Sequence, residues 1–90
     1  MSDLAEQLRQ ADCTVTEMAD GTAVVLDLRN EVLLTLNETA AFMLSRLRAG
    51  DDEAAIVRHV VERYEVAEET ARTDVASLLA EIAAAMQLPA

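Results

Sequence analysis

The sequence has little of several residue types, and each shortage excludes a class of protein. One cysteine among 90 residues leaves no partner for an intrachain disulfide, which excludes a disulfide-stapled domain. Two glycines cannot build a glycine-rich phosphate loop. No stretch approaches the roughly twenty apolar residues of a membrane span, so we expect no membrane partner. Residues 1–10 are polar, and we therefore expect no signal peptide and a cytoplasmic location.

Positive charge is also scarce. Seven basic residues stand against 17 acidic residues, which gives a formal net charge of −10. Proteins that bind nucleic acid neutralise phosphates with Lys and Arg, so this balance disfavours DNA or RNA as a partner. The chain is 52% hydrophobic, which is enough for a core and too apolar for a disordered segment. Its length predicts one small domain.

The first half of the chain predicts three strands with short links. Runs rich in β-forming residues cover residues 13–18, 23–28 and 32–36. Asp20 and Gly21 lie between the first two runs and tolerate the positive φ that a tight hairpin requires. In the turn at residues 29–31, we expect Asn30 to carry the positive φ. Such short links predict an antiparallel sheet.

The second half predicts three amphipathic helices. Apolar residues recur at helical spacing within residues 40–47, 56–64 and 75–86. Asn37 should cap the first helix by accepting from an N–H group of the first turn. Gly50 should end that helix in the left-handed conformation, and Asp51 or Asp52 should cap the next one. Three strands followed by three helices predict an α+β fold that resembles a winged helix-turn-helix.

Residues that could carry chemistry are few and do not form a recognisable catalytic set. His59 is the only histidine, and we place it on the polar surface of the second helix because no nucleophile stands at a suitable spacing. Asp51, Asp52 and Glu53 are better explained by a helix start, where acids complement the dipole, than by a metal site. Ser77 lacks the preceding Asp of an acyl-carrier attachment site. We expect a non-enzyme with no cofactor and no metal.

Several short segments in a fixed order carry a resemblance. They are Val25-Leu26-Asp27, Leu36-Asn37-Glu38-Thr39-Ala40, Ala49-Gly50-Asp51, Val60 to Tyr64, and Thr73-Asp74-Val75 with Leu78-Leu79. In this order they resemble the PqqD-like family, whose small domains are called RiPP recognition elements. These domains serve the biosynthesis of ribosomally made, modified peptides, and this chain is most similar to the stand-alone elements of lasso-peptide systems. The resemblance covers roughly residues 13–88, and we expect a recognition domain at residues 12–90. The polar residues 1–11 before it predict a flexible arm, with a loose helical turn as the alternative.

The resemblance implies non-catalytic binding of a precursor's leader peptide. In this family the leader adds a strand to the third strand, lies in the groove beside the third helix, and is presented to a maturation enzyme such as a leader protease or another modifying enzyme. Carried to this chain, the backbone contacts are Val32, Leu33, Leu34, Thr35 and Leu36. The groove wall is Arg72, Val75, Ala76, Leu78 and Leu79, and Arg72 either pairs with an acidic leader residue or is simply solvated.

Two other functions stay open. The same strand edge suits a dimerising structural or regulatory subunit, because an unpaired strand accepts any other strand. A DNA-binding winged helix is less favoured, since Arg72 is the only basic residue of the third helix. We expect a monomer or a weak homodimer. If Leu34 donates to the leader, Leu34→Pro should weaken binding by removing a main-chain donor while the helices stay folded.

Overall fold

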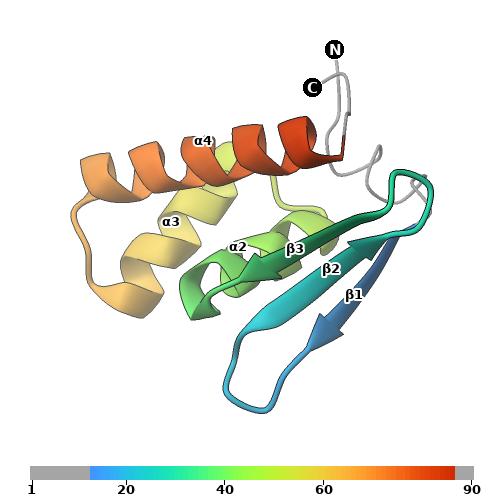
Figure 1. Ribbon diagram of the computed structural model, residues 1–90. Helices are drawn as coiled ribbons and strands as arrows, with labels where there is room; N and C mark the ends of the chain where they lie inside the picture. Colours follow the sequence, from blue (N-terminus) through green and yellow to red (C-terminus); the bar gives the residue numbers. More distant parts are fainter. Residues whose placement is uncertain (1–12, 87–90) are drawn as a thin grey trace.

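Residues 13–86 are described by a computed structural model, and within this range three strands precede three helices (Figure 1). The strands are β1 (Cys13–Glu17), β2 (Ala23–Asp27) and β3 (Val32–Leu36). The helices are α2 (Glu38–Arg48), α3 (Glu53–Tyr64) and α4 (Glu68–Ala85). The strands pair antiparallel in the order β1-β2-β3, which confirms the predicted α+β fold class. The arm predicted at residues 1–11 lies outside the described residues.

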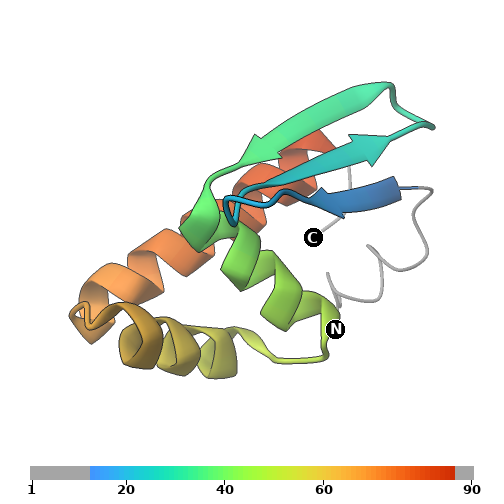
Figure 2. The same cartoon turned by 90° about the horizontal axis from the view of Figure 1, so that it is seen from below.

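The core lies between the helices and one face of the sheet. Ala23 and Val25 of β2 are buried on that face, while Leu26 between Val25 and Asp27 is 38% exposed on the other face. In Figure 1 α4 runs above the sheet, and the view from below in Figure 2 shows the strands in front of it. The helices contribute fully buried side chains such as Ile56 of α3. Burying a side chain of this size stabilises the fold by roughly 1.5–3 kcal/mol.

The turn between β1 and β2 is a tight hairpin, as predicted, but only one of its two expected residues has a positive φ. The Met18 N–H donates to the Thr22 carbonyl at 2.8 Å, and the Gly21 N–H donates to the Met18 carbonyl at 3.1 Å. The loop therefore has three residues, of which Gly21 alone has a positive φ, at 92°. The Asp20 carboxylate accepts from the Thr22 N–H and hydroxyl instead. A three-residue loop that ends in a left-handed glycine is the next most common way to join two such strands.

The turn between β2 and β3 corrects a second prediction. The positive φ falls on Glu31, at 55°, and the expectation that Asn30 would carry it was wrong. The side chain of Asn30 is used elsewhere. Its Nδ2 donates to the buried Asp27 carboxylate at 2.8 Å and to the Met86 carbonyl at 3.0 Å. The Arg29 N–H also donates to Asp27, at 3.0 Å. One polar network therefore fixes this turn and joins it to the end of α4.

The helix boundaries follow the predicted local signals. The Asn37 Oδ1 accepts from the Ala40 N–H at 2.8 Å, and the Asp52 Oδ1 accepts from the Ala55 N–H at 2.8 Å, so both caps are confirmed. Gly50 follows α2 with a φ of 108°, as predicted for its left-handed end. Such caps satisfy N–H and C=O groups that a helix end leaves without intrahelical partners. The short link between β3 and α2 is therefore fixed in direction.

Asp51 ties the end of α2 to α3. Its Oδ2 accepts from the Arg46 Nε at 2.7 Å, and the His59 Nδ1 lies 3.0 Å from the same oxygen. The hydrogen bond from Arg46 holds the pKa of Asp51 below its usual value. The His59 side chain is 34% exposed, so it is half-buried and not on the open polar surface that we expected. Between residues 13 and 86, no group of three or more His, Cys, Asp and Glu side chains is placed to hold a metal ion.

None of the helices in the described part of the chain combines the length and the hydropathy of a transmembrane segment.

We expect Asp27 to make the stability of the fold depend on acid pH. The hydrogen bond from Asn30 keeps the pKa of Asp27 below its usual value, so folding favours the ionised carboxylate. That stabilisation is complete above the unfolded-state pKa of about 3.9 and is lost as pH falls through the lower folded-state pKa. Asp27→Asn should therefore be less stable than wild type near neutral pH, with a difference that narrows below about pH 4 in urea-unfolding curves.

Asp74→Asn serves as the control, because Asp74 is an exposed carboxylate beyond the first turn of α4 and away from the β2–β3 turn. Its stability should follow that of wild type across the same pH range. A difference between Asp27→Asn and wild type that stays constant with pH would contradict the role assigned to the Asp27 charge.

Candidate functional site

The third strand has an open edge. β3 pairs with β2 on one side, and no described residue pairs with its other side. Figure 2 shows β3 as the outer strand of the sheet, with β1 at the opposite edge. An unpaired strand presents a row of N–H and C=O groups that another strand can bind. β3 leads directly into Asn37, which caps α2. The capped start of that helix therefore fixes the position of the end of β3.

The direction in which the backbone N–H and C=O groups of β3 point follows from the hydrogen bonds of the turn between β1 and β2. Thr22 accepts from Met18, so its carbonyl faces β1. Backbone polar groups alternate sides along a strand, so Val25, three residues on, faces β3. Val25 is the register partner of Leu34, whose N–H and C=O therefore turn back toward β2. By the same alternation, the N–H and C=O groups of Leu33 and Thr35 face the open edge.

The five predicted contacts on β3 thus divide into two sets. Val32, Leu34 and Leu36 direct their backbone groups into the sheet, and their side chains are half-buried or buried. Leu33 and Thr35 direct their backbone groups outward, and the Leu33 side chain is 65% exposed beside its cross-strand partner Leu26. Leu34→Pro would therefore break pairing within the sheet. Leu34 therefore does not meet the condition of the proline test stated above, and Leu33 and Thr35 are the informative positions.

A cavity of about 380 Å³ lies where β3 ends, between the start of α2 and α4. The strand end and α2 contribute Asn37, Thr39, Ala40 and Met43, and α4 contributes Asp74, Ser77, Leu78 and Glu81. The four residues from α4 are spaced by three and four, which places them on one face of the helix. The cavity therefore lies just past the end of β3 and is bordered by one face of α4.

The residues predicted on α4 do not all lie on this face. Leu78 lines the cavity. Val75 is fully buried, and the partly buried Leu79 packs against the core, so both contribute to packing. Ala76 is exposed and lines none of the cavities described here. Asp74, Ser77 and Glu81 were not predicted, although their spacing around Leu78 could have identified them once the buried side of the helix was known.

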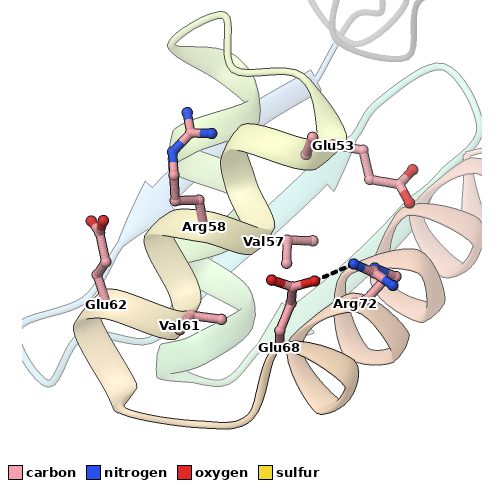
Figure 3. Close-up of a pocket in the computed structure, with 8 residues that line it drawn as sticks. Glu53, Val57, Arg58, Val61, Glu62, Glu68 and Arg72 are labelled. Carbon is pink, nitrogen blue, oxygen red and sulfur yellow. Dashed lines mark hydrogen bonds and ion pairs between the residues drawn. The ribbon is translucent and has the colours of Figure 1, made fainter.

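Arg72 lies in a different place, at a cavity of about 610 Å³ between α3 and α4 (Figure 3). Its guanidinium pairs with the carboxylate of Glu68, one turn earlier on the same helix. Val57 and Val61 of α3 contribute apolar surface to this cavity. The structure therefore does not bring Arg72 together with the residues that border the open edge of β3.

Comparisons with known proteins identify the family and the fold. Residues 22–86 match the family described as "Coenzyme PQQ synthesis protein D (PqqD)". The chain is similar to lasso peptide synthetase B1 complexed with the leader peptide, with 31% identity, a TM-score of 0.71, and 79% of this chain and 82% of that chain covered. It shares its fold with TbiB1 in complex with the TbiA(beta) leader peptide, with 22% identity, a TM-score of 0.75, and 80% and 83% covered. No curated protein matches significantly in sequence.

Amide hydrogen exchange should separate the two sets of residues on β3. The N–H groups of Leu33 and Thr35 face solvent, whereas that of Leu34 pairs with β2. We expect Leu33 and Thr35 to exchange at least about tenfold faster than Leu34, because a paired amide exchanges only when its hydrogen bond opens. On β1 the same alternation predicts slow exchange at Thr16 and fast exchange at Glu17, which provides an internal control. Equal protection of Leu33 and Leu34, or the reverse order, contradicts the assigned edge.

Proposed function

The chain belongs to the PqqD family, and we propose that it binds the leader region of a ribosomally synthesised precursor peptide without catalysing a reaction. The observation that carries the proposal is the open edge of β3 beside a cavity of about 380 Å³. The similarity to lasso peptide synthetase B1, whose structure holds a leader peptide, supports it. No cofactor or metal takes part in the proposed function.

The leader binds by adding a strand to the free edge of β3. Leu33 and Thr35 each offer one N–H and one C=O, so the edge provides up to four main-chain hydrogen bonds. Each such bond contributes roughly 0.5–1.5 kcal/mol net. Ordering a peptide costs about 1–2 kcal/mol per residue. Main-chain bonds alone therefore do not hold the leader, and side chains must also bury apolar surface.

The cavity beside β3 supplies that apolar surface. Met43 and Leu78 form its buried floor, and Ala40 contributes a smaller apolar surface. Successive side chains of an added strand point to opposite sides, so alternate leader residues can reach this cavity. Strand pairing provides affinity that is independent of sequence, and the cavity provides selectivity. Of the residues predicted on α4, we retain Leu78 as a direct contact and assign Val75 and Leu79 to the support of the cavity.

Once the leader is held, the attached core peptide stays near the maturation enzyme, a leader protease or another modifying enzyme. Tethering raises the effective concentration of the core at that enzyme, up to millimolar for a short flexible link. We place this step in the cytoplasm, where precursor peptides are synthesised.

A dimerising subunit is the second candidate, because the same open edge can pair with β3 of another copy. A DNA-binding function finds less support, since Arg72 pairs with Glu68 and α4 offers no basic face. Mass measurement over a range of protein concentration separates the candidates. A tight dimer that leaves no edge for a peptide would favour the subunit and contradict leader binding.

The proposed function is tested by fluorescence anisotropy with the two halves of a short precursor encoded beside this chain's gene. The leader half should bind saturably, and the core half should bind at least about tenfold more weakly, because only the leader supplies both strand and cavity contacts. Equal binding of both halves, or binding of neither to the folded domain, would count against the proposal.

Thr35→Pro should weaken leader binding at least about tenfold, because it removes an N–H group that faces the added strand. Glu17→Pro is the matched control. Glu17 lies on the free edge of β1, where a missing N–H leaves the leader contacts unchanged. Thr35→Ala controls for the side chain and should bind as wild type does. Circular dichroism must show all three variants folded. Equal losses in the two proline variants would contradict strand addition at β3.

A further inference from the structure

The geometry points to a basic side chain in the leader, selected by the carboxylates of Asp74 and Glu81 in the cavity beside β3. This inference rests on the proposed function and specifies the class of peptide that the edge accepts. It differs from the expectation based on Arg72, which would have favoured an acidic leader residue.

The charges that line this cavity have one sign. Asp74 and Glu81 both line it, and no basic residue of the described chain does. They lie seven residues apart on α4, which separates them by about 10 Å along the helix axis. Ser77 and Leu78 lie between them on the same face. A side chain that enters from the strand edge therefore meets apolar surface at the centre and a carboxylate at either end.

Both carboxylates are available to a ligand. Among residues 13–86, neither Asp74 nor Glu81 forms a hydrogen bond or an ion pair through its side chain. By contrast, Glu68 pairs with Arg72 at the other cavity, and Asp51 pairs with Arg46. Arg72 and Arg46 are thus already paired with other carboxylates. A basic side chain of the leader could therefore pair with Asp74 or Glu81 without displacing a partner among residues 13–86.

The shape of the site suits a long basic side chain. Lys and Arg bury their methylene stems on apolar surface and keep the charged end in a polar environment. Here Met43 and Leu78 can contact the stem, while the carboxylates at the cavity rim receive the charge. A leader Asp or Glu at the same position would instead face two like charges. The net charge of −10 attracts basic peptides from a distance in addition.

The test is selection from a displayed library of random peptides long enough to span β3. The bait is the whole chain, either as wild type or as the double variant Asp74→Asn/Glu81→Gln. We expect peptides selected on wild type to share Lys or Arg at one fixed position. Their affinity for the double variant should fall about twofold to fivefold, as expected for losing one solvent-accessible ion pair, whichever of the two carboxylates forms it.

Glu62→Gln/Glu69→Gln is the matched control, because it removes two charges on other surfaces. It should retain wild-type affinity. The charge-reversal variant Asp74→Lys/Glu81→Lys should select Asp or Glu at the same peptide position. That exchange requires the peptide side chain to contact these two positions.

The outcomes distinguish the two proposals. Peptides that bind wild type and lose affinity with Thr35→Pro, but share no basic position, would overturn the charge selection and leave leader binding intact. If Asp74→Asn/Glu81→Gln and Glu62→Gln/Glu69→Gln lower peptide affinity equally, the peptides are attracted by the overall negative charge. That result would overturn the assignment of charge selection to this cavity. If no peptide is enriched on the folded domain, the proposed function and this inference both fail.

Discussion

The position of β3 relative to α4 depends on one buried carboxylate. Asp27 is 2% exposed at the end of β2, and a buried charge without partners would cost several kcal/mol. Asn30 and two backbone N–H groups satisfy it, and Asn30 also reaches the carbonyl of Met86 at the end of α4. The start of β3 is therefore tied to one end of the helix. At the other end of β3, Asn37 directs the chain into α2. Together these contacts fix the strand edge beside the cavity.

The sequence predicted correctly those helix boundaries that depend only on residues a few positions away in the chain. Asn37 and Asp52 accept from N–H groups three residues ahead, and Gly50 adopts a conformation that other residues rarely adopt, so their roles follow from their neighbours in the chain. The order of strands and helices followed from hydrophobic periodicity for the same reason. Asn30 was misread because its amide is used by Met86, which is 56 residues away in sequence. No pattern within the turn reports such a contact.

The sequence indicated that the third strand has an open edge, but it did not indicate which backbone groups of that strand face outward. The turn was expected at residues 29–31, yet it spans residues 28–31 and pairs Asp27 with Val32. One residue in a turn changes which strand residues lie opposite each other, so the sequence could not identify the N–H groups on the edge. Likewise, the orientation of α4 depends on how Ala71, Val75 and Ile82 pack into the core. That packing turns Arg72 toward α3 and turns Asp74 toward the start of α2.

The composition of β3 has a consequence for the domain before any peptide arrives. Natural edge strands usually carry a charge, a proline or a bulge that prevents two copies from joining, and Val32–Leu36 contains no charged residue and no proline. Two copies that each carry −10 repel one another at longer range, and this repulsion opposes the pairing of two free β3 edges. The opposition is electrostatic. It weakens with ionic strength, as the screening length shortens from about 30 Å at low salt to about 8 Å under physiological conditions.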